Sequence, residues 1–208
     1  MIKNLYSSPI YTSNSSKELL DEVRSFISKI SIPSEIRANS TKGGFQSDSK
    51  IFEYNDKSII NLKRFIATEV AKYWPHIYEA LTGQKSESNV PAFDLWGWVT
   101  SLNAGGFNSP HIHPRSTISG VFYLQTPFEI IKNVDNNFSG WIGSMDPRSN
   151  SQIWPLSSHL NYFFVPPVEG SLVLFPSYLQ HFVPPFNAKD ERIAIAFNLR
   201  HKTTQLLK

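Results

Sequence analysis

Apolar residues in the first 90 positions recur three and four residues apart, which is the spacing of one helical face. Ser15 and Glu18 precede the first group at the spacing of a capping box, so we expect a helix to begin there. Ser58 precedes the second group and is the expected cap of a second helix, which Pro75 is expected to kink or end. The two groups are Leu19, Leu20, Val23, Phe26, Ile27 and Ile30, and Ile59, Leu62, Phe65, Ile66, Val70 and Tyr73.

From about residue 93 the pattern changes to short apolar, β-branched and aromatic runs between clusters of Gly, Pro, Asn and Ser. No helical period separates these runs, which argues against parallel βαβ units. We therefore expect one domain over residues 1–208, with a helical part over about 1–90 packed on a β core over about 91–200. The expected fold class is mainly β with N-terminal helices, a double-stranded β-helix of the jelly-roll or cupin type. The expected strands cover residues 95–103, 117–125, 140–145, 162–166, 171–175 and 193–199.

Composition and charge narrow the classes of function. The 208 residues are 40% hydrophobic and 18% charged, which is typical of a globular protein. The formal net charge is only +3, and no run of Lys and Arg alternates with aromatic residues, so nucleic-acid binding is disfavoured. The absence of cysteine excludes disulfides, thiolate zinc sites and cysteine nucleophiles. Without a signal-peptide segment or an apolar run of about 20 residues, we expect a cytoplasmic protein with no membrane partner.

Two closely spaced histidines carry the clearest chemical signal of the chain. His111 and His113 lie two positions apart between Pro110 and Pro114, which keep the segment extended, so both side chains point to the same side. His181 follows another strand-like run and supplies a third imidazole. Neutral imidazoles suit iron, copper, nickel and zinc, and an open triad leaves room for substrate and O2. We therefore expect a metal site, although each histidine taken alone also fits a surface loop.

A basic residue follows the third histidine at the start of another strand-like run. Arg192 lies eleven residues after His181, and in a double-stranded β-helix the last strands are neighbours. A fixed guanidinium there would suit the carboxylate of a co-substrate. The alternative is a strand-initiating arginine that faces solvent.

The order of these motifs resembles that of a known enzyme family. The segments HIHPRSTISGVFYL (residues 111–124) and GSLVLFPSYLQHFVPPFNAKDERIAIAFN (residues 170–198) resemble the 2-oxoglutarate/Fe(II)-dependent oxygenases, and GGFQS at residues 43–47 fits the same group. The resemblance implies a double-stranded β-helix, Fe(II), O2 and oxidative decarboxylation of 2-oxoglutarate to succinate and CO2, coupled to oxidation of a primary substrate, usually its hydroxylation. By position it makes His111 the first metal ligand, His181 the distal ligand, and Arg192 the partner of the 2-oxoglutarate C5 carboxylate.

This sequence departs from the family pattern at the second ligand. The family usually has Asp or Glu two residues after the first histidine, where this chain has His113. His113 could itself bind the metal, could support a two-histidine site completed by water, or could leave the position to a distant carboxylate such as Asp146. We favour ligation by His113.

A second departure lies beside the expected carboxylate site. Many members of the family have a hydroxyl two residues after the arginine, where this chain has Ala194. Ser119, Tyr123 or Asn198 could supply the missing donor for the co-substrate.

Two other classes of function remain open on the sequence alone. One is a cupin-type dioxygenase that uses three histidines, iron and O2 without 2-oxoglutarate. The other is a non-catalytic jelly-roll protein with a binding or structural role, because a fold alone does not define a function. The primary substrate and the oligomeric state are not indicated by the sequence.

Overall fold

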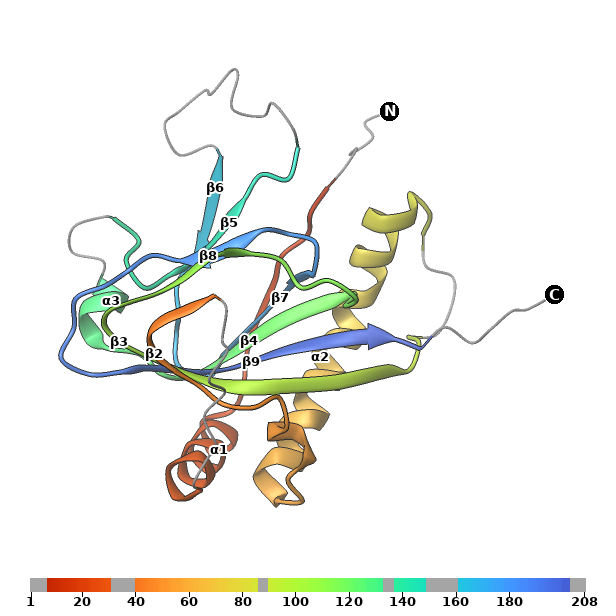
Figure 1. Ribbon diagram of the computed structural model, residues 1–208. Coiled ribbons are helices and arrows are strands. Elements are labelled where there is room, and N and C mark those ends of the chain that lie inside the picture. Colours follow the sequence, from red (N-terminus) through yellow and green to blue (C-terminus); the bar gives the residue numbers. More distant parts are fainter. Residues whose placement is uncertain (1–6, 31–39, 86–89, 133–136, 149–160, 203–208) are drawn as a thin grey trace.

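The computed structural model describes residues 7–30, 40–85, 90–132, 137–148 and 161–202. Two helices lie against one side of a strongly curled antiparallel sheet (Figure 1). This arrangement is the expected one of N-terminal helices packed on a β core. No helix in the described ranges is long and apolar enough to cross a membrane.

The first helix, α1 (Lys17–Lys29), begins one residue later than expected. Its cap is Ser16, whose side chain accepts a hydrogen bond from the backbone N–H of Leu19 at 3.2 Å. Ser15 instead donates its hydroxyl proton to the carbonyl of Ser16 at 3.0 Å. The capping box at Ser15 was therefore wrong, because adjacent serines offer the same side chain and the helix begins at Lys17, which makes Ser16 the cap.

The second helix, α2 (Lys57–Thr82), is capped by Asp56 rather than Ser58. The Asp56 carboxylate accepts from the Ser58 backbone N–H at 2.8 Å, and a carboxylate is also favoured by the helix dipole at this end. Pro75 lies inside the helix on its exposed face and does not end it. The helix continues to Gly83, whose left-handed backbone (φ 70°) closes it, because packing of the opposite face against the sheet outweighs the proline.

In the described part of the chain all paired strands are antiparallel, and eight of them follow the order β1-β7-β4-β9-β3-β8-β5-β6, with β2 paired to β3. Six of them match the expected strands, whereas β1, β2 and β8 were not predicted. Those three are short or rich in polar residues and glycine, so their own sequence carries little strand signal. The strands are β1 (Tyr11–Asn14), β2 (Thr41–Gln46), β3 (Phe93–His111), β4 (Ile118–Gln125), β5 (Ile142–Met145), β6 (Tyr162–Val165), β7 (Ser171–Pro176), β8 (His181–Val183) and β9 (Arg192–His201). A 3-10 turn, η1 (Ile51–Glu53), and a short helix, α3 (Phe128–Lys132), connect other parts of the chain.

Strand β3 joins the two halves of the curled sheet. Its first part pairs with β9 over residues 93–102, and its last part pairs with β8 through Asn108 and His111. The strand bends between these two pairing partners (Figure 1), and its register on β8 shifts between Asn108 and His111. The end of β3 therefore lies over the inner face of the sheet to which its first part belongs.

The two faces of the sheet have different roles. On the outer face, Val99, Ile195 and Phe197 belong to one buried cluster with the apolar face of α2. On the inner face, alternate residues form a smaller cluster that includes Val121, Tyr123, Val173, Phe175 and Ala194. The helices thus close the outer face and leave the inner face for the candidate site.

Candidate functional site

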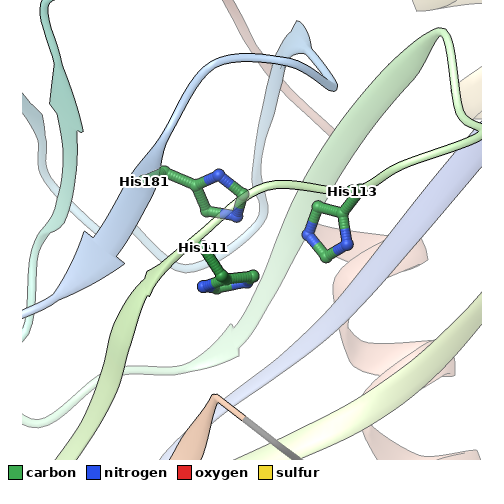
Figure 2. A group of neighbouring side chains, drawn as sticks. All are labelled: His111, His113 and His181. Atoms are coloured by element: carbon green, nitrogen blue, oxygen red, sulfur yellow. The ribbon is translucent and has the colours of Figure 1, made fainter.

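The three predicted histidines come together at the inner face of the sheet (Figure 2). His111 is the last residue of β3 and pairs across the strands with His181, the first residue of β8. His113 follows two positions later, and its backbone N–H donates to the carbonyl of Ser177 at 3.0 Å. One ring nitrogen from each histidine lies within 4.8 Å of the others. The three side chains are therefore close enough to bind one ion.

Backbone carbonyls orient two of the rings. His111 Nδ1 lies 2.7 Å from the Ser109 carbonyl, and His181 Nδ1 lies 2.9 Å from the Leu179 carbonyl. Because a carbonyl can only accept, each Nδ1 donates its proton and each Nε2 keeps a lone pair. Metal-binding histidines characteristically have this arrangement.

Burial keeps the cluster neutral. Burial, together with the nearby His111 ring, lowers the pKa of His181 to about 3 and that of His113 to about 4. Burial also lowers the pKa of His111, against a hydrogen bond to Ser109 that raises it. At neutral pH the three rings are uncharged, and neutral imidazoles suit Fe(II) and the other imidazole-binding metals.

Within the described part of the chain, no carboxylate joins this cluster. Asp146, which could have completed the triad, instead pairs with Arg148, whose Nε lies 2.9 Å from one carboxylate oxygen and 3.2 Å from the other. The Arg148 guanidinium also lowers the pKa of this carboxyl. Among the described residues, the side chains that could together bind a metal ion here are the three histidines.

A cavity extends from the histidines along the inner face. Its floor includes Ala196 on β9, between Trp98 on β3 and Val121 on β4. Two positions along β9, Ala194 lies between Thr100 and Tyr123. The same cavity is lined by Thr100, Tyr123 and Arg192, so a channel extends along β9 from Ala196 toward Arg192.

Arg192 lies at the other end of this channel and is only 3% exposed. No described carboxylate lies within salt-bridge distance of it, and its Nε has no hydrogen-bond partner. Its guanidinium lies 5.0 Å from the centre of the Tyr123 ring, and the buried Tyr123 hydroxyl has no well-formed hydrogen bond to any described residue. Burial lowers the pKa of Arg192 and raises that of Tyr123, and an interaction between the guanidinium and the hydroxyl, looser than a well-formed hydrogen bond, opposes both shifts. A buried cation beside a buried hydroxyl is a site suited to an anionic ligand.

Ser119 and Asn198, the other candidate donors for the co-substrate, lie at the histidine end. The Ser119 hydroxyl donates to Asn198 Oδ1 at 2.7 Å, and Asn198 Nδ2 lies 3.4 Å from His113 Nδ1. Neither residue lines the cavity, whereas Tyr123 does. Of the three candidates, Tyr123 alone lies beside Arg192.

Two further cavity residues were missed by the sequence analysis. Thr100 is the cross-strand neighbour of Ala194, and Gln46 on β2 is the neighbour of Thr100. Asn108 donates to Thr41 at 3.0 Å and Thr41 donates to the Gln46 side-chain oxygen at 2.9 Å, which leaves the Gln46 amide nitrogen as a donor. The GGFQS segment signals this position, but the register of β2 on β3 is needed to bring it to the cavity.

Comparison with known proteins agrees with this geometry. Residues 97–198 match the model of the family described as "Putative 2OG-Fe(II) oxygenase". These residues include all three histidines and Arg192. None of the curated proteins compared with the chain matches it.

Solved structures with the same fold include two prolyl hydroxylases and a protein with 2-oxoglutarate bound. A prolyl-4-hydroxylase from Pseudomonas putida is 16% identical, with a TM-score of 0.58 and 94% of each chain covered. A prolyl hydroxylase from Trichoplax adhaerens, solved with a hypoxia inducible factor peptide fragment, is also 16% identical, with a TM-score of 0.59 over 92% of this chain and 83% of that one. HygX from Streptomyces hygroscopicus, with nickel and 2-oxoglutarate bound, is 10% identical, with a TM-score of 0.59 over 94% of this chain and 84% of that one. The matches confirm the predicted jelly-roll fold.

Proposed function

We propose that the protein is a 2OG-Fe(II) oxygenase, the family whose model residues 97–198 match, and that it hydroxylates a primary substrate at the three-histidine site. The enzyme uses Fe(II), 2-oxoglutarate and O2. In the proposed reaction, one oxygen atom of O2 enters the substrate as a hydroxyl group and the other enters succinate. The remaining carbon of 2-oxoglutarate leaves as CO2.

The proposed metal ligands are His111, His113 and His181. The Nδ1 protons of His111 and His181 are held by backbone carbonyls, so their Nε2 lone pairs are available, and burial keeps the rings neutral. Three protein ligands leave positions for the co-substrate and O2. Bound Fe(II) supplies the redox chemistry of O2, while the protein supplies ligands, orientation and a site shielded from water.

The proposed co-substrate contacts are Arg192 and Tyr123. A guanidinium binds a carboxylate through two parallel hydrogen bonds, and the Tyr123 hydroxyl beside it can donate a third. The channel over Ala194 and Ala196 would hold the carbon chain of 2-oxoglutarate between this anchor and the histidines, with Thr100 at its side. The single observation that carries the proposal is the buried Arg192, which no described carboxylate pairs with, in the cavity that the histidines line.

A three-histidine dioxygenase that does not use 2-oxoglutarate is the second candidate. The replacement of the usual carboxylate by His113 favours it, because the three candidate metal ligands among the described residues then carry no negative charge. Arg192 opposes it, since such an enzyme has no need of a buried guanidinium in the cavity that the histidines line.

Turnover of the co-substrate distinguishes the two candidates. The purified protein is incubated with Fe(II), ascorbate, O2 and 2-oxoglutarate labelled at C1, and released CO2 is counted. We expect the wild type to release labelled CO2 and His181→Ala to release none. His201→Ala, a matched change at the exposed end of β9, should leave the release unchanged. A protein that binds Fe(II) but releases no labelled CO2 would contradict the proposal and favour the second candidate.

A further inference from the structure

His113 differs from the other two histidines in its hydrogen-bond partner. The Nδ1 atoms of His111 and His181 face carbonyl oxygens, whereas Nδ1 of His113 lies 3.4 Å from the side-chain nitrogen of Asn198. An amide nitrogen can only donate, so in this arrangement Nδ1 of His113 accepts and the proton of the neutral ring is on Nε2. A protonated Nε2 has no lone pair for a metal.

Two buried serines hold the amide of Asn198 in this orientation. Ser119 donates its hydroxyl proton to Asn198 Oδ1 at 2.7 Å, so the 2.9 Å contact between Ser119 and Ser177 requires Ser177 to donate. Ser119 and Ser177 are each 1% exposed and Asn198 is 4% exposed. The hydrogen bonds therefore run in one direction, from Ser177 through Ser119 and Asn198 to His113.

The same chain of hydrogen bonds can run the other way without losing a bond. If the amide of Asn198 turns over, Oδ1 accepts from a protonated Nδ1 of His113, and Nδ2 donates to Ser119. Ser119 then donates to Ser177, because a hydroxyl can both donate and accept. In that direction Nε2 of His113 has a free lone pair, as it does in His111 and His181.

We propose that Asn198, backed by Ser119 and Ser177, is a positioning residue that determines whether His113 binds the metal. Metal binding reverses the direction of these hydrogen bonds and leaves Asn198 Oδ1 as the acceptor for the Nδ1–H of His113. The inference rests on the proposed function, since it concerns one of its three ligands. Neither Asn198 nor Ser119 lines the cavity, so both act through His113 rather than on a bound molecule.

Substitutions at Asn198 test this role through metal affinity in the absence of any turnover. In Asn198→Asp the carboxylate only accepts, so it holds Nδ1–H of His113 permanently, and we expect Co(II) to bind more tightly. In Asn198→Ala the acceptor is lost, and we expect Co(II) affinity to fall about tenfold, as for other residues that orient metal ligands. Asn103→Asp, at an exposed position of β3, makes the same change of charge and should leave the affinity unchanged.

Two further measurements separate positioning from the added charge. In a His113→Ala background, Asn198→Asp should no longer change Co(II) affinity, whereas a purely electrostatic effect would persist and overturn the proposal. Electron spin echo modulation of the Cu(II)-loaded protein counts coordinated imidazoles, and we expect three in the wild type and two in Asn198→Ala. Ser119→Ala, a smaller change, should weaken Co(II) binding in the same direction if Asn198→Ala does not fold.

The outcomes also separate this inference from the proposed function. If the wild type binds metal and turns over 2-oxoglutarate while Asn198→Ala keeps three imidazoles and full affinity, the positioning role is refuted and the oxygenase proposal stands. If the wild type binds no metal, the proposed function itself fails.

Discussion

Arg192 places a cation where the described residues offer it no anion. Burying an uncompensated charge is costly, so in the ligand-free protein this residue lowers the free energy of unfolding. In the proposed function, the carboxylate of the co-substrate offsets this cost. A residue that destabilises the free protein and is satisfied by a ligand is characteristic of a binding site.

Arg192→Met should therefore have opposite effects on stability and on binding. Without ligand, we expect the free energy of unfolding to rise by about 1 kcal/mol or more, because an apolar side chain of similar length replaces a buried charge. The affinity for 2-oxoglutarate should fall by about 10- to 100-fold, because a charge-assisted hydrogen-bonded pair is lost. Urea denaturation and anaerobic titration measure the two effects. A variant that is less stable and binds 2-oxoglutarate normally would contradict the role of Arg192.

The histidines make the metal-free protein sensitive to acid. Their pKa is 6.5 in the unfolded chain, whereas burial lowers it to about 4 for His113 and about 3 for His181 in the folded protein. Their contribution to stability is fully present above pH 6.5 and is lost as the pH falls toward 4, because only the unfolded chain takes up protons there. Each such histidine adds at most about 1.4 kcal/mol per pH unit to the slope.

We accordingly expect the urea midpoint of the metal-free protein to fall between pH 7 and pH 5. The fall should be smaller in His181→Asn, which removes one of the depressed groups and keeps a short polar side chain near the Leu179 carbonyl. His76→Asn, on the exposed face of α2, should follow the wild type. Equal slopes in all three proteins would mean that the histidines are not buried as the structure has them.

Among the elements, β2 closes the cavity although its sequence scarcely predicts a strand. A Cβ atom added at Gly44 would meet the Ser101 carbonyl oxygen and would lie 2.9 Å from the Leu102 Cα. Only glycine therefore lets β2 approach β3 closely enough for Gln46 to reach the cavity wall. The glycines of the GGFQS segment thus have a structural reason that the sequence analysis did not identify.

Gly44→Ala should push β2 away from β3, at a cost of about 1–3 kcal/mol in the free energy of unfolding. We expect it also to weaken 2-oxoglutarate binding, because Gln46 moves with the strand. Gly105→Ala is the matched control, since Gly105 has a positive φ of 76° but open space around it. That change should lower stability through backbone strain alone and leave the affinity unchanged. Normal co-substrate binding in Gly44→Ala would show that β2 does not shape the site.

Local sequence patterns predicted the elements that long apolar runs define and the residues that one strand brings together. The two-residue period of an extended chain predicted that His111 and His113 point to the same side. Apolar runs predicted the strands β3, β4, β7 and β9. The caps at Ser16 and Asp56 were missed because neighbouring residues offer equivalent side chains. Contacts such as Asn198 with His113, or Gln46 beside Thr100, depend on the register between distant strands, which no local pattern contains.

For the whole molecule, ligand binding and folding are linked. A ligand that binds only the folded protein stabilises it by about 2.7 kcal/mol at a concentration one hundred times its dissociation constant. With redox-inert Mn(II), we expect the melting temperature to rise on adding metal and to rise again on adding 2-oxoglutarate. The second increment should be much smaller in Arg192→Met at the same 2-oxoglutarate concentration, and an unchanged increment would contradict the role of Arg192.

The most direct test of the oxygenase assignment is anaerobic Fe(II) loading followed by 2-oxoglutarate, monitored by visible absorption. Chelation of Fe(II) by the keto and C1 carboxylate oxygens produces a weak charge-transfer band. We predict this band in the wild type, its loss in His181→Ala, and its appearance only at higher 2-oxoglutarate concentration in Arg192→Met. Bound Fe(II) with no band at saturating 2-oxoglutarate would contradict the account.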